Sequence, residues 1–530
     1  MKKTFTYIFA GLAVLLGLNA CVKDLDVTPI DPNLVVMEDP SPLFNKCYAN
    51  MALAGNGGAN GDCDIDGLDG GTTGFVRQLW NSNELTTDEA ICGWGDEGIA
   101  SFVYDSYDAS HPMLRGYYYR LYGGIGYCNH YLHEAGDYNA TMTAEVRLLR
   151  ALYYYLAMDA FGNIPFTLVV SSELAPQYTR AQMFEWLEKE ILEVEPALSE
   201  PKVKKDNQDG YGRVDKAAAW LLLARMYLNA EVYTGTARWN DAATYAKKVM
   251  DSPYDLHRTG NSAYSAYQML FMADNGESSA TVEAILPVIQ DGLKVTSWGT
   301  TLFLIASTSN NDIPTGTSEA WAGNRARPDL LRKFFPAGEV PAVDKDEMVK
   351  RAGDDRALFW GQGRTLDCED VSQYTNGYSV AKFNNIRSDG GATSDAQFVD
   401  TDFYLLRAAE AWLTYAEATA RANGGTVTAE GVAALNDIRS RAHATTRTSY
   451  TLDDILDEWS REFFFEGRRR MDLVRFGCFG GNNSYNWQWK GGSYSGTSFE
   501  AYRNIFAIPT TDLTANKNLV QNDGYNTATE

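Results

Sequence analysis

The sequence has few of the residues on which metal centres and nucleotide sites depend. It contains only five histidines, and its seven cysteines form no CxxC pair and no metal-ligand spacing with those histidines. It also lacks a nucleophile elbow, an HExxH zinc motif, a P-loop and the glycine fingerprint of dinucleotide-binding folds. A zinc site is therefore not expected, and the common catalytic motifs are absent.

Positive charge is also scarce. The 530 residues include 46 lysines and arginines against 69 aspartates and glutamates, so the formal net charge is −23. A field of this sign repels phosphate backbones and anionic surfaces, so nucleic acid is not expected as a partner. Hydrophobic residues make up 45% of the chain and charged residues 22%, which is typical of a folded globular protein.

The apolar run from Phe5 to Leu18 is too short to span a bilayer comfortably. Two lysines precede it, and it leads into Leu18, Asn19, Ala20 and Cys21, the pattern of a bacterial lipoprotein signal peptide. We expect residues 1–20 to be removed, Cys21 to be acylated, and residues 21–42 to form a tether, because several acyl chains anchor a protein stably. The alternative is a plain secretory signal with an incidental cysteine.

Six further cysteines follow Cys21, in a chain expected to be exported. Disulfide bonds are permitted there, but six cysteines allow fifteen connectivities, so no pairing is predicted. They are Cys47, Cys63, Cys92, Cys128, Cys368 and Cys478.

Helical periodicity recurs in several blocks. The pattern predicts a helix over residues 143–161, ended by Gly162 and Pro165, and a helix-turn-helix pair over 217–228 and 239–250. Small residues at helical spacing in this pair are typical of tetratricopeptide-like units. Late helices are predicted over 403–422 and 430–443, and a third begins at Thr451, three residues before Asp454 in a capping-box arrangement. The fold should be mainly α.

Between these blocks, residues 255–400 are rich in Gly, Ser, Thr and Asn, with short apolar runs. Residues 60–100 have a similar composition. Long stretches with loop chemistry usually carry function. The binding part of the protein is therefore predicted in these two segments.

Several motifs along the chain resemble those of the SusD/RagB outer-membrane nutrient-binding lipoproteins of Bacteroidetes. They are Arg150–Tyr155 with Phe161–Pro165, Asp215–Leu228, Leu406–Glu417, Arg461–Arg475 and Ile508–Tyr525. Trp459, Lys517 and Asp523 depart from the usual pattern and are interpreted as local packing changes. The charged residues of the fourth motif, Glu462, Glu466, Arg468 and Arg470, alternate with aromatics as internal ion pairs do.

The resemblance implies a single SusD-like domain over residues 43–530. It would contain a tetratricopeptide-like helical scaffold at about 110–250 and 400–475, loop-rich binding insertions at about 60–100 and 255–400, and little β structure. It also implies a lipid-anchored protein on the outside of the outer membrane. Such a protein captures oligosaccharides for a SusC-like TonB-dependent transporter, which it caps like a hinged lid, and does no chemistry. The RagB branch, associated with peptide cargo, is the alternative.

A sugar site needs flat aromatic rings flanked by polar side chains that read hydroxyl groups. Three loop stretches offer this mixture, and the resemblance implies an arc of Trp94, Trp298 and Trp321 with Arg77 as a hydrogen-bonding partner. For each tryptophan, the alternative role is a lid over the core. The full set of candidate ligand-binding residues is Arg77, Trp80, Asn81, Asp88, Trp94, Trp298, Trp321 and Asn324.

Three weaker candidates complete the set. Trp487 and Trp489, near Lys490, form a second aromatic cluster that would contact ligand or transporter. The acidic loop containing Asp62, Asp64, Asp66 and Asp69 could hold a structural calcium ion, although a polar turn is the better interpretation and no cofactor is expected. Asp88 with Glu97 is the carboxylate pair that a glycosidase would need, but acidic residues are abundant enough to explain it, so no enzyme activity is predicted.

Overall fold

The computed structural model describes residues 39–525. Of these, the residues from Leu43 onward form one compact unit. The predicted signal peptide, the acylation site at Cys21 and most of the predicted tether lie outside the described residues. Among the helices that are described, none is both long and apolar enough to cross a membrane.

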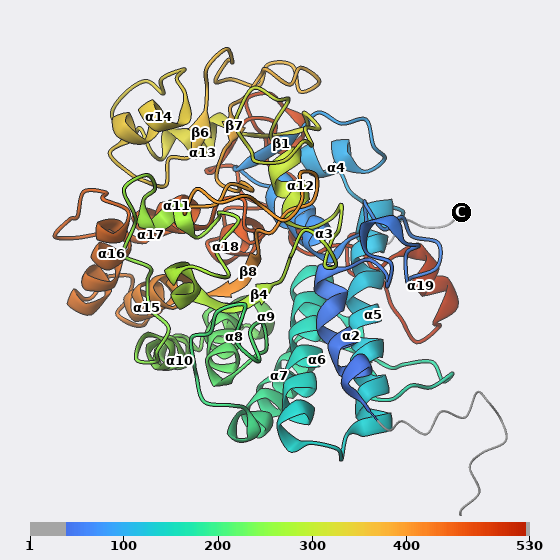
Figure 1. Ribbon diagram of the computed structural model, residues 1–530. Coiled ribbons are helices and arrows are strands. Elements are labelled where there is room, and N and C mark those ends of the chain that lie inside the picture. Colours follow the sequence, from blue (N-terminus) through green and yellow to red (C-terminus); the bar gives the residue numbers. More distant parts are fainter. Residues whose placement is uncertain (1–38, 526–530) are drawn as a thin grey trace, which may run out of the picture. The chain divides into compact units, whose positions relative to one another are not determined.

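The described chain is mainly helical, as predicted (Figure 1). Its α-helices are α2 (Ser41–Ala52), α3 (Phe75–Trp80), α4 (Ile99–Val103), α5 (Pro112–Ala135), α6 (Ala140–Phe161), α7 (Arg180–Val194), α8 (Lys216–Leu228), α9 (Ala230–Thr234), α10 (Trp239–Met250), α11 (Ala266–Met269), α12 (Thr301–Ala306), α13 (Pro328–Arg332), α14 (Lys345–Ala352), α15 (Ala409–Ala422), α16 (Ala429–Arg441), α17 (Leu452–Phe463), α18 (Arg469–Arg475) and α19 (Thr510–Ala515).

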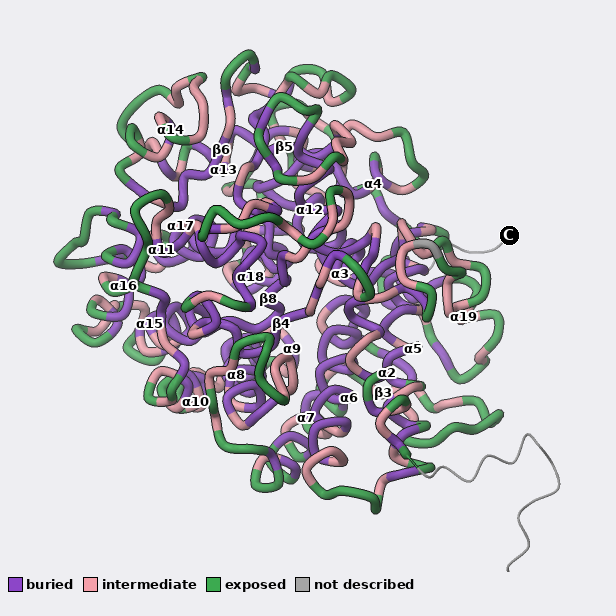
Figure 2. The backbone as a smooth tube through the Cα atoms, viewed as in Figure 1, coloured by how far each residue is buried: buried purple, intermediate pink, exposed green. Residues whose placement is uncertain are grey.

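The long helices pack in a continuous series, in which α5 packs on α6, α6 on α7, α8 on α10, α10 on α15, and α15 on α16. Stacking of this kind lets each helix cover the apolar face of its neighbour, as in tetratricopeptide-like scaffolds. Figure 2 shows that α6 and α8 are buried along most of their length. The predicted mainly helical fold is therefore confirmed, and its long helices stack on one another.

Local signals set the ends of these helices. Asn139 accepts hydrogen bonds from the first turn of α6, which ends at Gly162 with a φ of +71°. The predicted capping box of α17 is formed by Thr451 and Asp454. Such caps satisfy backbone groups that a helix end leaves unpaired. The predicted helices at 143–161, 217–228, 239–250, 430–443 and 451–463 are confirmed to within a few residues.

The strands are short, and the described residues form four two-stranded antiparallel sheets. The paired strands are β1 (Ala90–Cys92) with β5 (Asn324–Ala326), β2 (Ile164–Pro165) with β3 (Gln177–Tyr178), β4 (Ala284–Val288) with β8 (Phe403–Arg407), and β6 (Phe359–Trp360) with β7 (Ser379–Val380).

Two sequence predictions of secondary structure are wrong. The helix predicted over 403–422 begins only at Ala409, because Phe403–Arg407 pair with β4 as strand β8. A short apolar run does not distinguish a buried strand from a helix. Residues 74–98, part of the segment 60–100 that was predicted to be loop-rich, contain α3, a π-helical turn at Asn81–Leu85 and β1, and most of them are buried (Figure 2).

Buried ion pairs join strand β8 to α17 and to the residues that follow it. Arg407 pairs with Glu462 at 2.7 Å and with Glu466 at 2.7 Å. Burial alone would raise the pKa of Glu462, but Arg441, Arg407 and Arg356 outweigh it and lower this pKa to about 2. The predicted internal ion pairs of Glu462 and Glu466 are thus confirmed.

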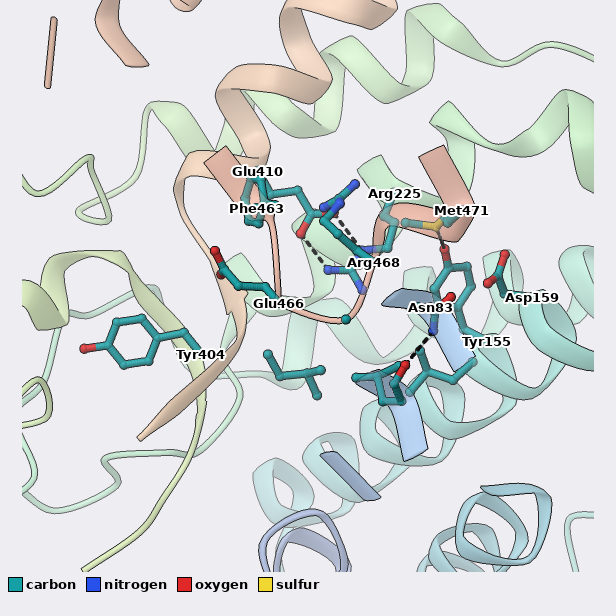
Figure 3. Close-up of a pocket in the computed structure, with 14 residues that line it drawn as sticks. Asn83, Tyr155, Asp159, Arg225, Tyr404, Glu410, Phe463, Glu466, Arg468 and Met471 are labelled. Carbon is teal, nitrogen blue, oxygen red and sulfur yellow. Dashed lines mark hydrogen bonds and ion pairs between the residues drawn. The ribbon is translucent and has the colours of Figure 1, made fainter. Parts of the chain in front are cut away.

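The same motif lines a small internal cavity, shown in Figure 3, where Arg225 and Arg468 converge on Glu410. Nε and Nη2 of Arg225 donate to the two carboxylate oxygens of Glu410 at 2.6 Å each, and Nη1 of Arg468 lies 3.2 Å from Glu410. The cavity holds about 30 Å³, which suits a water molecule and no sugar. Arg470 differs from the prediction, since its guanidinium lies 4.1 Å from the ring centre of Phe506 and it makes no ion pair with the described residues.

Candidate ligand-binding site

The three tryptophans of the predicted arc come together from separate loops. The pairing of β1 with β5 brings Trp94, which follows β1, close to Trp321, which precedes β5. The Trp94 Nε1 donates to the carbonyl oxygen of Trp321 at 3.0 Å. The rings of Trp298 and Trp321 lie 6.2 Å apart, centre to centre, and are inclined at 47°. Segments more than 200 residues apart thus form one aromatic cluster.

Trp298 and Trp321 line a cavity of about 470 Å³. Small-molecule pockets commonly measure roughly 300–1,000 Å³. Both residues are half-buried, so part of each side chain stays accessible. The remaining lining consists mostly of small residues, which leave room and present backbone groups. They are Ala54, Gly58, Ala59, Gly61, Asp69, Gly70, Gly71 and Ser297. Gly61, Asp69, Gly70 and Gly71 fall within the segment 60–100 that was predicted to bind, whereas Gly58 and Ala59 lie just before it.

Specific contacts fix both rings. Trp298 donates from Nε1 to the carbonyl oxygen of Ala59 at 3.0 Å and packs against Phe398, with ring centres 5.0 Å apart. Trp321 donates from Nε1 to Glu319 at 2.7 Å. The other carboxylate oxygen of Glu319 accepts from Gln397 at 2.7 Å. Rings held in this way lose little conformational freedom when a ligand binds.

The backbone at Trp321 is held in an uncommon conformation. Its neighbour Ala322 has a φ of +50°, in the left-handed region that residues with a Cβ rarely adopt. Hydrogen bonds of 2.8 Å from Trp321 N to Ala306 O and from Ala322 N to Ser309 O keep it there. Strain of this kind persists where surrounding contacts determine it, often at ligand sites.

Trp94 and Arg77 support the cavity without lining it. The Trp94 ring lies against the backbone of Gly323, where an added Cβ would come within 2.1 Å of Cε2. The Arg77 guanidinium lies 5.3 Å from the centre of the Trp94 ring, and its Nη1 donates to Gly71 O at 3.2 Å. Both residues belong to the predicted cluster, but they position Trp321 and the glycine-rich turn.

Four predicted ligand contacts are buried, with at most 1% of each residue exposed: Trp80, Asn81, Asp88 and Asn324. Trp80 packs between Phe303 and Phe465. Asn81 lies in the π-helical turn, and Asn324 donates from β5 to Ser307 at 2.9 Å. Their prediction as ligand-contacting residues is therefore wrong, because distant segments of the fold cover them.

Asp88 is committed to a buried ion pair. It lies 2.8 Å from both Arg469 and Lys333 and accepts from the Tyr485 hydroxyl at 2.7 Å. Burial would raise the pKa of Asp88, but Arg469 and Lys333 outweigh this and hold it far below its usual value. Glu97, in contrast, is exposed. These two carboxylates therefore do not form the acid–base pair that a glycosidase would need.

The second aromatic cluster is part of the core. Trp487 is 1% exposed and stacks on Phe479, and the Lys490 ammonium lies 4.4 Å from the centre of its ring. Trp489 is half-buried and donates to Cys368 O at 2.7 Å. The prediction of a ligand or transporter contact is wrong for Trp487, because Leu456, Leu473 and Phe479 bury it in an apolar cluster.

Two aspartates of the acidic loop already interact with other groups of the protein. Asp64 lies 2.7 Å from both Lys46 and Arg120, and Asp69 accepts from the backbone of Thr72 at 2.8 Å. Within residues 39–525, no cluster of three or more acidic, histidine or cysteine side chains could hold a metal ion. The six cysteines after Cys21 are all free thiols in this part of the chain.

Known proteins resemble this chain over nearly its whole length. The profile of the SusD family matches residues 227–525. The starch-binding protein SusD of Bacteroides thetaiotaomicron is 39% identical over 96% of both chains, and a SusD-like protein of Bacteroides ovatus is 23% identical over 66% of this chain and 62% of its own.

Solved structures share the fold at lower identity. The surface glycan-binding protein A of Bacteroides uniformis is 22% identical, with a TM-score of 0.66 over 91% of this chain and 99% of its own. The corresponding protein of B. thetaiotaomicron, in complex with laminarihexaose, is 20% identical, with a TM-score of 0.64 over 91% and 98%. The family profile and the 39% identity show that this chain belongs to the SusD family.

Proposed function

We propose that this protein binds a neutral glucan of the starch type against Trp298 and Trp321 and delivers it, chemically unchanged, to a SusC-like TonB-dependent transporter. The observation that carries the proposal is the pair of half-buried indole rings, inclined at 47°, on one wall of a 470 Å³ cavity. The relative with 39% identity is a starch-binding protein, which supports the same ligand class.

The inclination of the two rings suits a curved chain. Each indole face can stack on the apolar C–H face of one sugar ring, and two inclined faces follow successive sugars whose planes turn relative to each other. Helical α-glucans turn in this way, whereas flat, extended glucans present parallel planes. The exposed Asp69 and backbone groups of the glycine-rich turn also line the cavity and can hydrogen-bond to sugar hydroxyl groups.

Binding should be moderate and should grow with chain length. An aromatic contact contributes roughly 0.5–1.5 kcal/mol beyond the area that it buries. Two such contacts favour an oligosaccharide that spans both rings over a single sugar. A lipoprotein that must release its cargo to a transporter needs affinity of this order.

Several observations support binding without turnover. Retaining glycosidases place two carboxylates about 5–5.5 Å apart across the scissile bond. Of the described residues, Asp69 is the one carboxylate that lines the cavity. Asp88 is locked in its ion pair with Arg469. Within the described residues the cavity wall thus presents one carboxylate, which supports a binding role.

The proposed location is the outer face of the outer membrane, with a lipid anchor at Cys21. It rests on the N-terminal pattern and on membership of the SusD family. The same membership supports the transporter as partner. Radiolabelled palmitate incorporation into the full chain, lost in a Cys21→Ala variant, would test the anchor. Co-purification with an outer-membrane transporter would test the partner.

Isothermal titration tests the ligand. The protein without residues 1–21, which keeps every described residue, would be titrated with maltoheptaose, laminarihexaose and a mixed tripeptide set. We expect maltoheptaose to bind and Trp298→Ala or Trp321→Ala to weaken it at least tenfold. Trp239→Ala, at the start of α10, is the matched control. Binding of tripeptides but of neither glucan would place the protein in the peptide-binding branch and refute the proposal.

A further inference from the structure

A second cavity, of about 290 Å³, lies apart from the tryptophan cavity and shares no lining residue with it. Its walls come from α11, β6, the start of α14, and residues 313–315 and 381–386. Its volume is at the lower end of the roughly 300–1,000 Å³ typical of small-molecule pockets. None of the functions proposed above uses this cavity.

Two half-buried aromatic rings line it, Tyr264 and Trp360. Successive side chains of a strand point to opposite sides, so β6 directs Phe359 into the core and Trp360 to the other side. Phe359 stacks on Phe464 at 5.0 Å, whereas Trp360 lies on the cavity wall. Neither Trp360 nor Tyr264 pairs with another aromatic ring among residues 39–525. Both side chains line the cavity and are half-buried, so part of each is accessible to a ligand there.

Two amide side chains in the cavity wall could donate hydrogen bonds to a ligand. The Oε1 of Gln268 accepts from Ser265 N at 2.9 Å in the capping box of α11. The Oδ1 of Asn384 accepts from Ile386 N at 3.0 Å. The NH₂ group of each amide makes no hydrogen bond to the described part of the chain. Each can donate two hydrogen bonds into the cavity.

The charges in the wall are already balanced. Lys345 lies 2.5 Å from Asp346, and the Lys382 ammonium lies 2.7 Å from Glu466. Charged ligands would meet no uncompensated charge there. The other groups in the cavity wall are aromatic rings and amide donors. Aromatic rings can stack on the C–H surface of a neutral sugar, and amide donors can hydrogen-bond to its hydroxyl oxygens.

We propose that this cavity is a second sugar-binding site, which takes one or two rings of a neutral glucan between Tyr264 and Trp360. The identity of the ligand class rests on the function proposed above. Residues 313–315 line the second site, and Trp321, at the end of the same loop, lines the first. Two sites on one chain raise the effective affinity for a polysaccharide with many equivalent segments.

Fluorine NMR tests the site directly. The protein without residues 1–21 would be labelled with 5-fluorotryptophan, and Trp360→Phe, Trp321→Phe and Trp239→Phe would assign three resonances. We expect maltose to shift the Trp360 and Trp321 resonances and to leave that of Trp239 in place.

If Trp321 responds to saturating maltose and Trp360 does not, the second site is refuted and the first one stands. If neither responds to maltose or maltoheptaose, both proposals fail. A Trp360 resonance that moves with tripeptides but not with maltose also overturns the sugar assignment.

Retention on polysaccharide provides a second readout. In gels containing amylopectin, we expect Trp360→Ala and Tyr264→Ala each to weaken retention at least threefold. Affinity for maltoheptaose at the tryptophan cavity should stay within twofold of the unmodified protein. Thermal unfolding would identify a variant that fails to fold, in which case Tyr264→Phe, which keeps the ring, serves as the comparison. Unchanged retention of both folded alanine variants would overturn the proposal.

Discussion

The Nε1 of Trp94 donates a hydrogen bond to the carbonyl oxygen of Trp321 at 3.0 Å, across 227 residues of sequence. The bond connects the end of β1 to the loop that carries one wall of the ligand cavity. Trp94 therefore acts on a ligand through Trp321, whose backbone it holds. This relationship leads to the first prediction.

Replacing Trp94 with phenylalanine should weaken glucan binding modestly. Phenylalanine keeps an aromatic ring against Gly323 but has no N–H for the carbonyl oxygen of Trp321. One hydrogen bond contributes about 1 kcal/mol, so maltoheptaose affinity should fall roughly fivefold in isothermal titration. Trp94→Ala should cost more. Equal affinity for all three proteins would show that Trp94 does not position the site.

Gly323→Ala should disturb the ligand site through the Trp94 ring, which lies against Gly323. The added Cβ would lie 2.1 Å from Cε2 of Trp94, so the ring or the backbone must move. Overpacking of this kind costs about 1–3 kcal/mol, which should appear as a lower free energy of unfolding and at least tenfold weaker binding. Gly338→Ala is the matched control, because a Cβ there meets no atom within 4 Å.

Glu462→Gln should destabilise the fold strongly. It leaves Arg407, Arg441 and Arg356 without one of their shared carboxylates in a fully buried network. Breaking a buried pair costs about 3–5 kcal/mol of unfolding free energy, measurable in urea. Arg351→Gln removes an exposed ion pair with Glu347 and should have no detectable effect. A loss of the same size in both variants would contradict the buried-network interpretation.

The same network predicts a loss of stability in acid. The pKa of Glu462 falls from 4.5 in the unfolded chain to about 2 in the folded protein, so folding favours the ionised form. Its contribution to stability is therefore complete above pH 4.5 and is lost as the pH falls from 4.5 towards 2. Urea midpoints measured across this range should decline. Glu462→Gln should show a shallower decline, and an identical slope would contradict the prediction.

Asp88→Asn should affect stability and leave binding intact. The substitution removes the charge that pairs with Arg469 and Lys333, so about 3–5 kcal/mol of unfolding free energy should be lost. Maltoheptaose affinity at a temperature where the variant is folded should stay within twofold. Glu97→Gln, at an exposed position, should change neither quantity. Hydrolysis of maltoheptaose by the unmodified protein, lost in Asp88→Asn, would revive the enzyme hypothesis.

The scaffold could be predicted because its signals are local. The helix over 143–161 follows from spacing and from Gly162, and the capping box at Thr451 needs only three neighbouring residues. The clustering of Trp94, Trp298 and Trp321 was also anticipated, although from family resemblance. No local pattern indicated that the turn around Gly58 and Gly71 completes the cavity.

Long-range contacts decided the rest. The residues that flank Trp80 and Asp88 in the sequence are typical of a ligand-facing loop. Phe465 and Arg469, nearly 400 residues later in the chain, nevertheless pack against these two side chains and help to bury them. Most of the helices, the family resemblance and the expected export signal follow from the amino-acid sequence alone, since each depends on residues close together in the chain. Which aromatic side chains stay partly exposed follows from the folded structure, because burial depends on partners that the chain brings together when it folds.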